Sequence, residues 1–120
     1  MNILAISNLY PPDFLGGYEL ICAQTANALR ARGHDVCVLT SSTPQANEPA
    51  PHVRRTLRLN EFYDAAWMNA ALTLRLCEVE AKFINAQNVH HLLATLDEVR
   101  PDAVLLYNLI GLGRYLSLGP

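Results

Sequence analysis

Hydrophobic residues along this chain fall into short continuous runs and into stretches with helical spacing. Continuous runs occupy residues 2–6, 36–40 and 103–107, and polar residues, glycine or proline bound each of them. This pattern is typical of strands buried on both faces of a parallel sheet. Over residues 18–32 the apolar positions recur with helical spacing, and Gly33 ends that stretch. Residues 2–40 therefore predict a right-handed strand-helix-strand unit with parallel strands. The side of this helix expected to face the sheet carries Ile21, Cys22, Thr25, Ala28 and Leu29.

The rest of the chain continues the alternation of strands and helices. Residues 53–59 alternate apolar and polar positions, which predicts a third strand with one exposed face near a sheet edge. The alternation puts Arg55 on the side of the apolar residues and Arg54 and Arg58 on the other side. Arginine on such a strand usually belongs to a solvated face, and a basic patch of Arg54, Arg55 and Arg58 that binds phosphate or a partner is the alternative. Residues 60–100 contain neither proline nor glycine and predict two helices or one bent helix.

The two halves of residues 60–100 differ in how clearly they predict a helix. Apolar residues at helical spacing in the second half are expected to cover the sheet: Val89, Leu92, Leu93, Leu96 and Val99. Polar residues between them are expected to face water: Asn88, His91, Thr95, Asp97 and Glu98. Residues 62–76 have less regular spacing, although a helix is also expected there. A further short helix is expected over residues 114–118.

A glycine pair precedes the first helix. Pro11 and Pro12 end the first strand, and the following loop reaches Gly16 and Gly17 just before the helical stretch. Such glycines let a phosphate approach the free N–H groups and the positive end of a helix. The spacing is neither G-x-G-x-x-G nor a P-loop, so a tight turn without a ligand remains the alternative.

The opening motif resembles a known enzyme family. The run N-I-L-A-I-S-N-L-Y-P-P-x-x-x-G-G-Y-E, followed by L-x-x-R-G-H-D-V-x-V-L-T, is similar to the start of the retaining GT-B glycosyltransferases often called group 4. R-P-D-A-V-L-L-Y-N at residues 100–108 matches a later strand of that family more loosely. The resemblance implies that residues 1–120 are the amino-terminal, acceptor-side domain of a two-domain enzyme whose donor-binding domain lies outside this chain.

The resemblance also implies a fold and a site. The fold is α/β, a three-layer Rossmann-like domain with a parallel sheet of strand order 3-2-1-4 and helices on both faces. Gly16 and Gly17 would approach the diphosphate of a nucleotide-sugar donor. Glu19, Tyr107 and Asn108 are candidates for contact with sugar or acceptor, although Glu19 at the helix start is better suited to stabilising that helix end.

Two details of the resemblance qualify the site. Asn108 stands where the family often has a histidine; asparagine can hydrogen-bond a hydroxyl but cannot act as a base, so no residue is assigned a catalytic role. Tyr63 or Trp67 would line the acceptor cleft. Transfer would retain configuration and need no metal or other cofactor, and the isolated domain would be inactive.

Composition excludes other classes of protein. Nine Lys and Arg against eleven Asp and Glu give a net charge of −2, which does not favour nucleic-acid binding. Three cysteines without C-x-x-C spacing indicate reduced core residues of a cytoplasmic protein. Four histidines lack ligand spacing, so no metal site is expected. No transmembrane segment is expected, and peripheral membrane contact stays open.

Two other functions remain compatible with the sequence. One is a non-catalytic binding or scaffolding module with the same fold, and the other is a nucleotide-sugar epimerase of the same two-domain architecture. A sheet that ends at its fourth strand exposes an edge, so homo-oligomers through that edge are a further expectation.

Overall fold

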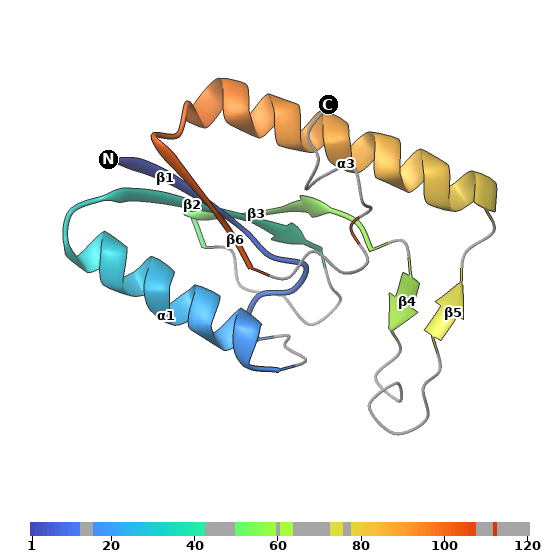
Figure 1. Ribbon diagram of the computed structural model, residues 1–120, viewed down its shortest axis with the longest axis horizontal. Coiled ribbons are helices and arrows are strands. Elements are labelled where there is room, and N and C mark those ends of the chain that lie inside the picture. The colour runs from blue at the N-terminus through green and yellow to red at the C-terminus, as the bar shows by residue number, and fades with distance from the viewer. Residues whose placement is uncertain are drawn as a thin grey trace.

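The computed structural model describes residues 1–12, 16–42, 50–59, 61–63, 73–75, 78–107 and 112. Four parallel strands form its main sheet: β1 (Asn2–Ile6), β2 (Asp35–Ser41), β3 (Val53–Leu57) and β6 (Ala103–Leu106). Their order is β3-β2-β1-β6, which confirms the predicted order 3-2-1-4. Helix α1 (Gly17–Ala31) lies on one face and helix α3 (Glu78–Val99) on the other, so the fold is a three-layer α/β arrangement (Figure 1).

Alternate side chains of the central strands supply two separate cores. Ile3 and Ala5 of β1 pack on the α1 side, whereas Leu4 and Ile6 pack on the α3 side. Every residue of this run from Ile3 onward is buried, as expected of a parallel strand covered on both faces. The same alternation along β2 puts Val38 on the α1 side and Leu39 on the α3 side.

The buried face of helix α1 is narrower than its apolar residues predict. Glu19, Cys22 and Ala26 are its buried residues, at a spacing that puts them on one helix face. Ile21 is 51% exposed and Ala28 is also exposed, so the expectation that these two face the sheet is wrong. Hydrophobicity alone could not orient this helix, because one of the residues it buries is a glutamate.

Strand β3 contains an irregularity that changes which way its side chains face. Leu39 pairs with Arg54 and Ser41 with Leu57, so two residues of β3, Arg55 and Thr56, stand opposite Thr40. This bulge breaks the predicted alternation: Val53 packs on the α1 side, whereas Leu57 is fully buried on the α3 side. The prediction that β3 lies at a sheet edge is confirmed.

Helix α3 buries polar residues that were expected to face water. Asn88 is fully buried: its Oδ1 accepts from Arg58 N, and its Nδ2 donates to the carbonyl oxygens of Arg58 and Leu112. Thr95 is 2% exposed and its hydroxyl donates to the His91 carbonyl at 2.8 Å. Leu93 was expected to cover the sheet, but it is 42% exposed, so that expectation is wrong. Asn88 can face inward because all its contacts satisfy backbone groups, a role that apolar spacing does not reveal.

The described part of residues 60–77 is a hairpin and not a helix. β4 (Glu61–Tyr63) and β5 (Thr73–Arg75) pair antiparallel, with Phe62 opposite Leu74. The helix expected over residues 62–76 is therefore wrong for these two segments. Aromatic and β-branched residues favour strands, and short apolar runs fit either period. Trp67 and the helix expected over residues 114–118 lie outside the described residues, as does the side chain of Tyr63.

β6 carries exposed apolar side chains on the α3 side of the sheet, since Val104 and Leu106 pair with Leu4 and Ile6. Val104 is 45% and Leu106 is 51% exposed, while Leu105 packs into the core on the α1 side. β6 is the last strand in the sheet order, so its outer backbone groups have no strand beside them in the described residues. Association of copies through this edge stays a prediction.

Candidate functional site

The reversal of strand order locates the place where this fold binds ligands. The chain passes from β1 through α1 to β2, which pairs with one side of β1. β6 pairs with the other side of β1. In open α/β sheets the ligand crevice lies outside the carboxyl ends of the strands at such a point. Here it lies beyond the ends of β1 and β6, where Tyr107 N donates to Ile6 O at 3.0 Å. The candidate site is therefore built by residues that follow these strands and by the start of α1.

Gly16 and Gly17 are exposed at the amino terminus of α1. Gly16 has an extended backbone with φ −161°, and a Cβ added to either glycine would meet no atom within 4 Å. Neither conformation nor packing thus requires glycine here, in contrast to Gly33, whose φ is +91°. The tight-turn alternative loses its physical reason, and access to the backbone remains as the property that a glycine pair provides.

Glu19 supports this helix end from inside the protein. Its side chain is buried, and Oε2 accepts a hydrogen bond from Gly16 N at 3.0 Å. The N–H groups that follow in the first turn have no intrahelical partner and point along the helix axis. Burial, followed by the charge of Glu19, raises the pKa of the Cys22 thiol to about 11, so this cysteine stays protonated at neutral pH.

Two unpaired hydroxyls lie side by side at the same edge. Ser7 N donates to Leu39 O, which continues the ladder of β1 and β2 and puts Ser7 beside Thr40. Alternation from Ala5 and Val38 puts both side chains on the α1 side of the sheet. Ser7 and Thr40 are fully buried, and neither hydroxyl has a hydrogen-bond partner among the described residues. Unpaired polar atoms of this kind are rare and call for an explanation.

Arg55 fixes the loop that joins β1 to α1. Its guanidinium donates to the carbonyl oxygens of Pro11 at 2.9 Å, Ser41 at 3.4 Å and Tyr10 at 3.5 Å. It also lies over the Tyr10 ring, 5.9 Å from the centroid. Burial is the largest cause that raises the pKa of Tyr10. Arg55 thus lies on the same side of β3 as Val53, half-buried against this loop, and not on a solvated face.

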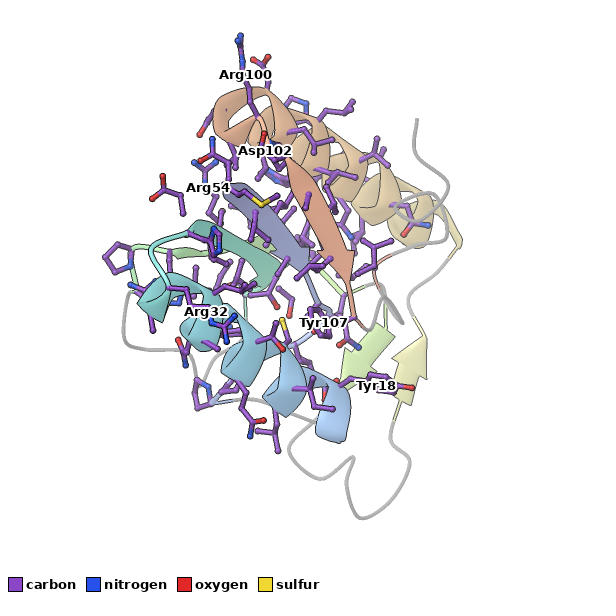
Figure 2. The ribbon with its side chains drawn as sticks, turned by 60° about the vertical axis from the view of Figure 1, so that its left-hand side comes forward. Tyr18, Arg32, Arg54, Arg100, Asp102 and Tyr107 are labelled. Atoms are coloured by element: carbon purple, nitrogen blue, oxygen red, sulfur yellow. The ribbon has the colours of Figure 1, made fainter. Side chains whose placement is uncertain are left out.

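Tyr107 lies at the end of β6, half-buried against the core on the α1 side. Figure 2 shows Tyr107 near the first turns of α1, where Tyr18 projects, and at the opposite end of β6 from Arg100 and Asp102. The structure thus brings Tyr107, Gly16 and Gly17 to one end of the sheet. Asn108 lies outside the described residues, and its contact with a sugar stays a prediction.

Comparisons of this chain with family models, with curated proteins and with solved structures give no match. Within the part of the chain that the structure describes, no group of three His, Cys, Asp or Glu side chains is placed to bind a metal ion. No described helix is long and apolar enough to cross a membrane.

Proposed function

We propose that this chain is the acceptor-side domain of a glycosyltransferase that moves a sugar from a nucleotide-diphosphate donor to an acceptor with retention of configuration. One observation carries the proposal. Gly16 and Gly17 lie open at the start of α1, at the strand-order reversal, and neither is required to be glycine by backbone or packing. The amides and the dipole of this helix end favour the charge of a diphosphate.

Each residue of the site then has a role in the proposed reaction. The amides of the first turn of α1 would stabilise the negative charge that develops on the departing nucleoside diphosphate. Glu19 is a positioning residue, since its carboxylate is bonded to Gly16 N and shielded from solvent. Tyr107 and Asn108 would hydrogen-bond sugar or acceptor hydroxyls.

Ser7 and Thr40 give the proposal a second support. Leaving a buried hydroxyl unpaired costs about 1–3 kcal/mol, and such costs are often found at functional sites. Both hydroxyls lie in the strand ends next to the open helix end. We propose that ligand binding moves the loop enough to give them a partner.

Nuclear magnetic resonance of the ¹⁵N-labelled chain, titrated with inorganic pyrophosphate, tests the binding step. We expect the amide signals of Gly17 and Tyr18 to shift, with no comparable shift at Leu93, which is exposed on α3. The substitution Gly17→Asp should weaken pyrophosphate binding at least tenfold, because the added carboxylate would repel the negatively charged ligand at the start of α1. Shifts that avoid the start of α1 altogether would contradict the proposal.

A second assay separates transfer from the two other functions. The full-length natural protein is incubated with nucleotide-diphosphate sugars, and the release of nucleoside diphosphate is followed with and without candidate acceptors. Acceptor-dependent release supports transfer. Conversion of the donor sugar without an acceptor would identify an epimerase, and binding without turnover would identify a binding module.

A further inference from the structure

A pocket lies at the other end of the sheet, where the parallel strands begin. It has a volume of about 410 Å³ and opens between the last turn of α1, the start of β2 and the turn that precedes β3. Its polar lining residues are Asn2, Arg30, His34, Asp35 and His52. None of them takes part in the candidate site at the carboxyl ends of the strands.

His52 is the unusual residue of this pocket. Both ring nitrogens, Nδ1 and Nε2, are shielded from solvent and lack a hydrogen-bond partner in the structure. Its backbone is fixed, because the His52 carbonyl accepts from Val38 N at 2.8 Å. A neutral imidazole always carries one N–H donor. His52 therefore holds an unused donor just beneath the wall of this pocket, where a turn of the ring would bring it to a bound ligand.

The other groups that face the pocket make it favourable for negative charge. Arg30 is exposed and makes no ion pair within the described residues. His34 Nδ1 lies 3.3 Å from the Met1 amino group, which leaves its Nε2 to donate elsewhere. Asp35 is the single carboxylate among the lining residues, and it is exposed.

We propose that this pocket binds the oxyanion group of a small molecule, a phosphate or sulfate monoester, between Arg30, His34 and His52. The three donors come from three different segments and surround the group, which suits a tetrahedral oxyanion better than a planar carboxylate. The pocket is large enough for more than a bare ion, so the rest of the ligand would lie along Val36 and Pro51.

Binding at this pocket is linked to protonation of His52. Burial, followed by the charge of Arg30, lowers the pKa of His52 from its ordinary value of 6.5. A bound dianion would favour the imidazolium, and so affinity rises as pH falls. Arg30 on α1 is the charge that acts on His52, and the other titratable groups of the pocket are His34, Asp35 and Cys37 at the start of β2.

Sulfate is a suitable probe, because its charge stays constant between about pH 5.5 and pH 7.5, so that a change in affinity reports on groups of the protein. The ¹⁵N-labelled chain is titrated with sulfate at both pH values, and the amide shifts of residues 34–37 and 52–53 are followed. We expect binding at this end of the sheet, with affinity at least threefold higher at the lower pH. Acetate should bind more weakly.

Variants with a matched control identify the residues. Arg30→Gln should weaken sulfate binding about tenfold, whereas Arg32→Gln should change it less than twofold, since Arg32 does not line the pocket. His52→Gln keeps a donor but should reduce the gain in affinity at the lower pH, and an unchanged gain would remove His52 from the site. Equal effects of Arg30→Gln and Arg32→Gln, tighter binding of acetate than sulfate, or absence of these shifts at tens of millimolar sulfate would each overturn the proposal. The pyrophosphate titration reads Gly17 at the other end of the sheet, so the two proposals can fail separately.

Discussion

Arg55 Nη2 donates to the Pro11 carbonyl oxygen at 2.9 Å and so joins β3 to the loop that leads into α1. The two residues are 44 positions apart in the chain. A proline offers its neighbours a carbonyl but no N–H, so a cation is a suitable partner for this part of the backbone. Through Arg55 the edge strand helps to hold the loop of the candidate site.

Replacement of Arg55 should destabilise the fold. Arg55→Met keeps the aliphatic part of the side chain and removes the donors to three carbonyl oxygens. We expect a loss of about 1.5–3 kcal/mol in the free energy of unfolding, as for hydrogen bonds with one charged partner. Urea denaturation measures it. Arg58→Gln is the control: its exposed side chain makes one long contact to Gln87, so the change should stay within about 0.5 kcal/mol. Equal losses in both variants would argue against the role of Arg55.

Removal of the unpaired hydroxyls should not harm the unliganded protein. Ser7→Ala and Thr40→Val each delete a buried hydroxyl that has no partner, so stability should be unchanged or rise by about 1 kcal/mol. Ser41→Ala is the matched contrast, because its hydroxyl donates to Asn8 O at 2.6 Å and its loss should cost about 1–2 kcal/mol. Thermal unfolding compares the three. Pyrophosphate affinity should fall in the first two variants; unchanged affinity would remove these hydroxyls from the site.

Replacement of Gly17 and of Gly33 by alanine should change the stability of the protein in opposite directions. Gly17→Ala restricts the unfolded chain without strain and should stabilise the protein by about 0.5 kcal/mol. Gly33→Ala places a side chain at φ +91° and should cost at least about 1 kcal/mol. Denaturation curves of the two variants test the difference. A large loss of stability in Gly17→Ala would mean that this glycine serves the fold after all.

Stability should decline on the alkaline side because of Cys22. Burial and Glu19 raise its pKa to about 11, above the value of the unfolded chain. The stabilisation is complete below the unfolded pKa and is lost as pH rises through about 11. We expect the unfolding midpoint to fall between about pH 9 and pH 10.5, and less steeply in Cys22→Ala. Because the pKa of Tyr10 is also raised, part of the decline should persist in that variant. Identical slopes would exclude Cys22 as a cause.

The strands of the main sheet could be predicted from sequence because each is buried in a simple pattern. β1, β2 and β6 are continuous apolar runs, and Gly33 and Pro101 mark the ends of the helices between them. Arg100, just before that proline, adopts φ +48°, the conformation that often follows a helix. Continuous burial, glycine and proline are local properties, so they can be recognised without the fold.

Properties that depend on distant partners could not be predicted. Asn88 is buried because the backbone of Arg58 and Leu112 needs its amide, and those contacts exist only in the folded chain. Ser7 and Thr40 looked like ordinary residues after two strands, and only the register of β1 with β2 puts them together. The pocket at the beginning of the parallel strands likewise brings together His34 and His52, whose spacing in the sequence does not suggest a common site. Gly16 and Gly17 could be placed at the start of α1 from sequence because their motif is local.

The bulge in β3 also determines how the strand tolerates changes in length. Thr56 is exposed and is the surplus residue opposite Thr40. A chain that lost Thr56 would pair Arg55 with Thr40 and keep Leu57 opposite Ser41, so each inward side chain would stay on its present face. Loss of Arg54 would instead exchange the faces of Val53 and its neighbours. Deletion of Thr56 should therefore be tolerated in evolution, whereas deletion of Arg54 should be eliminated.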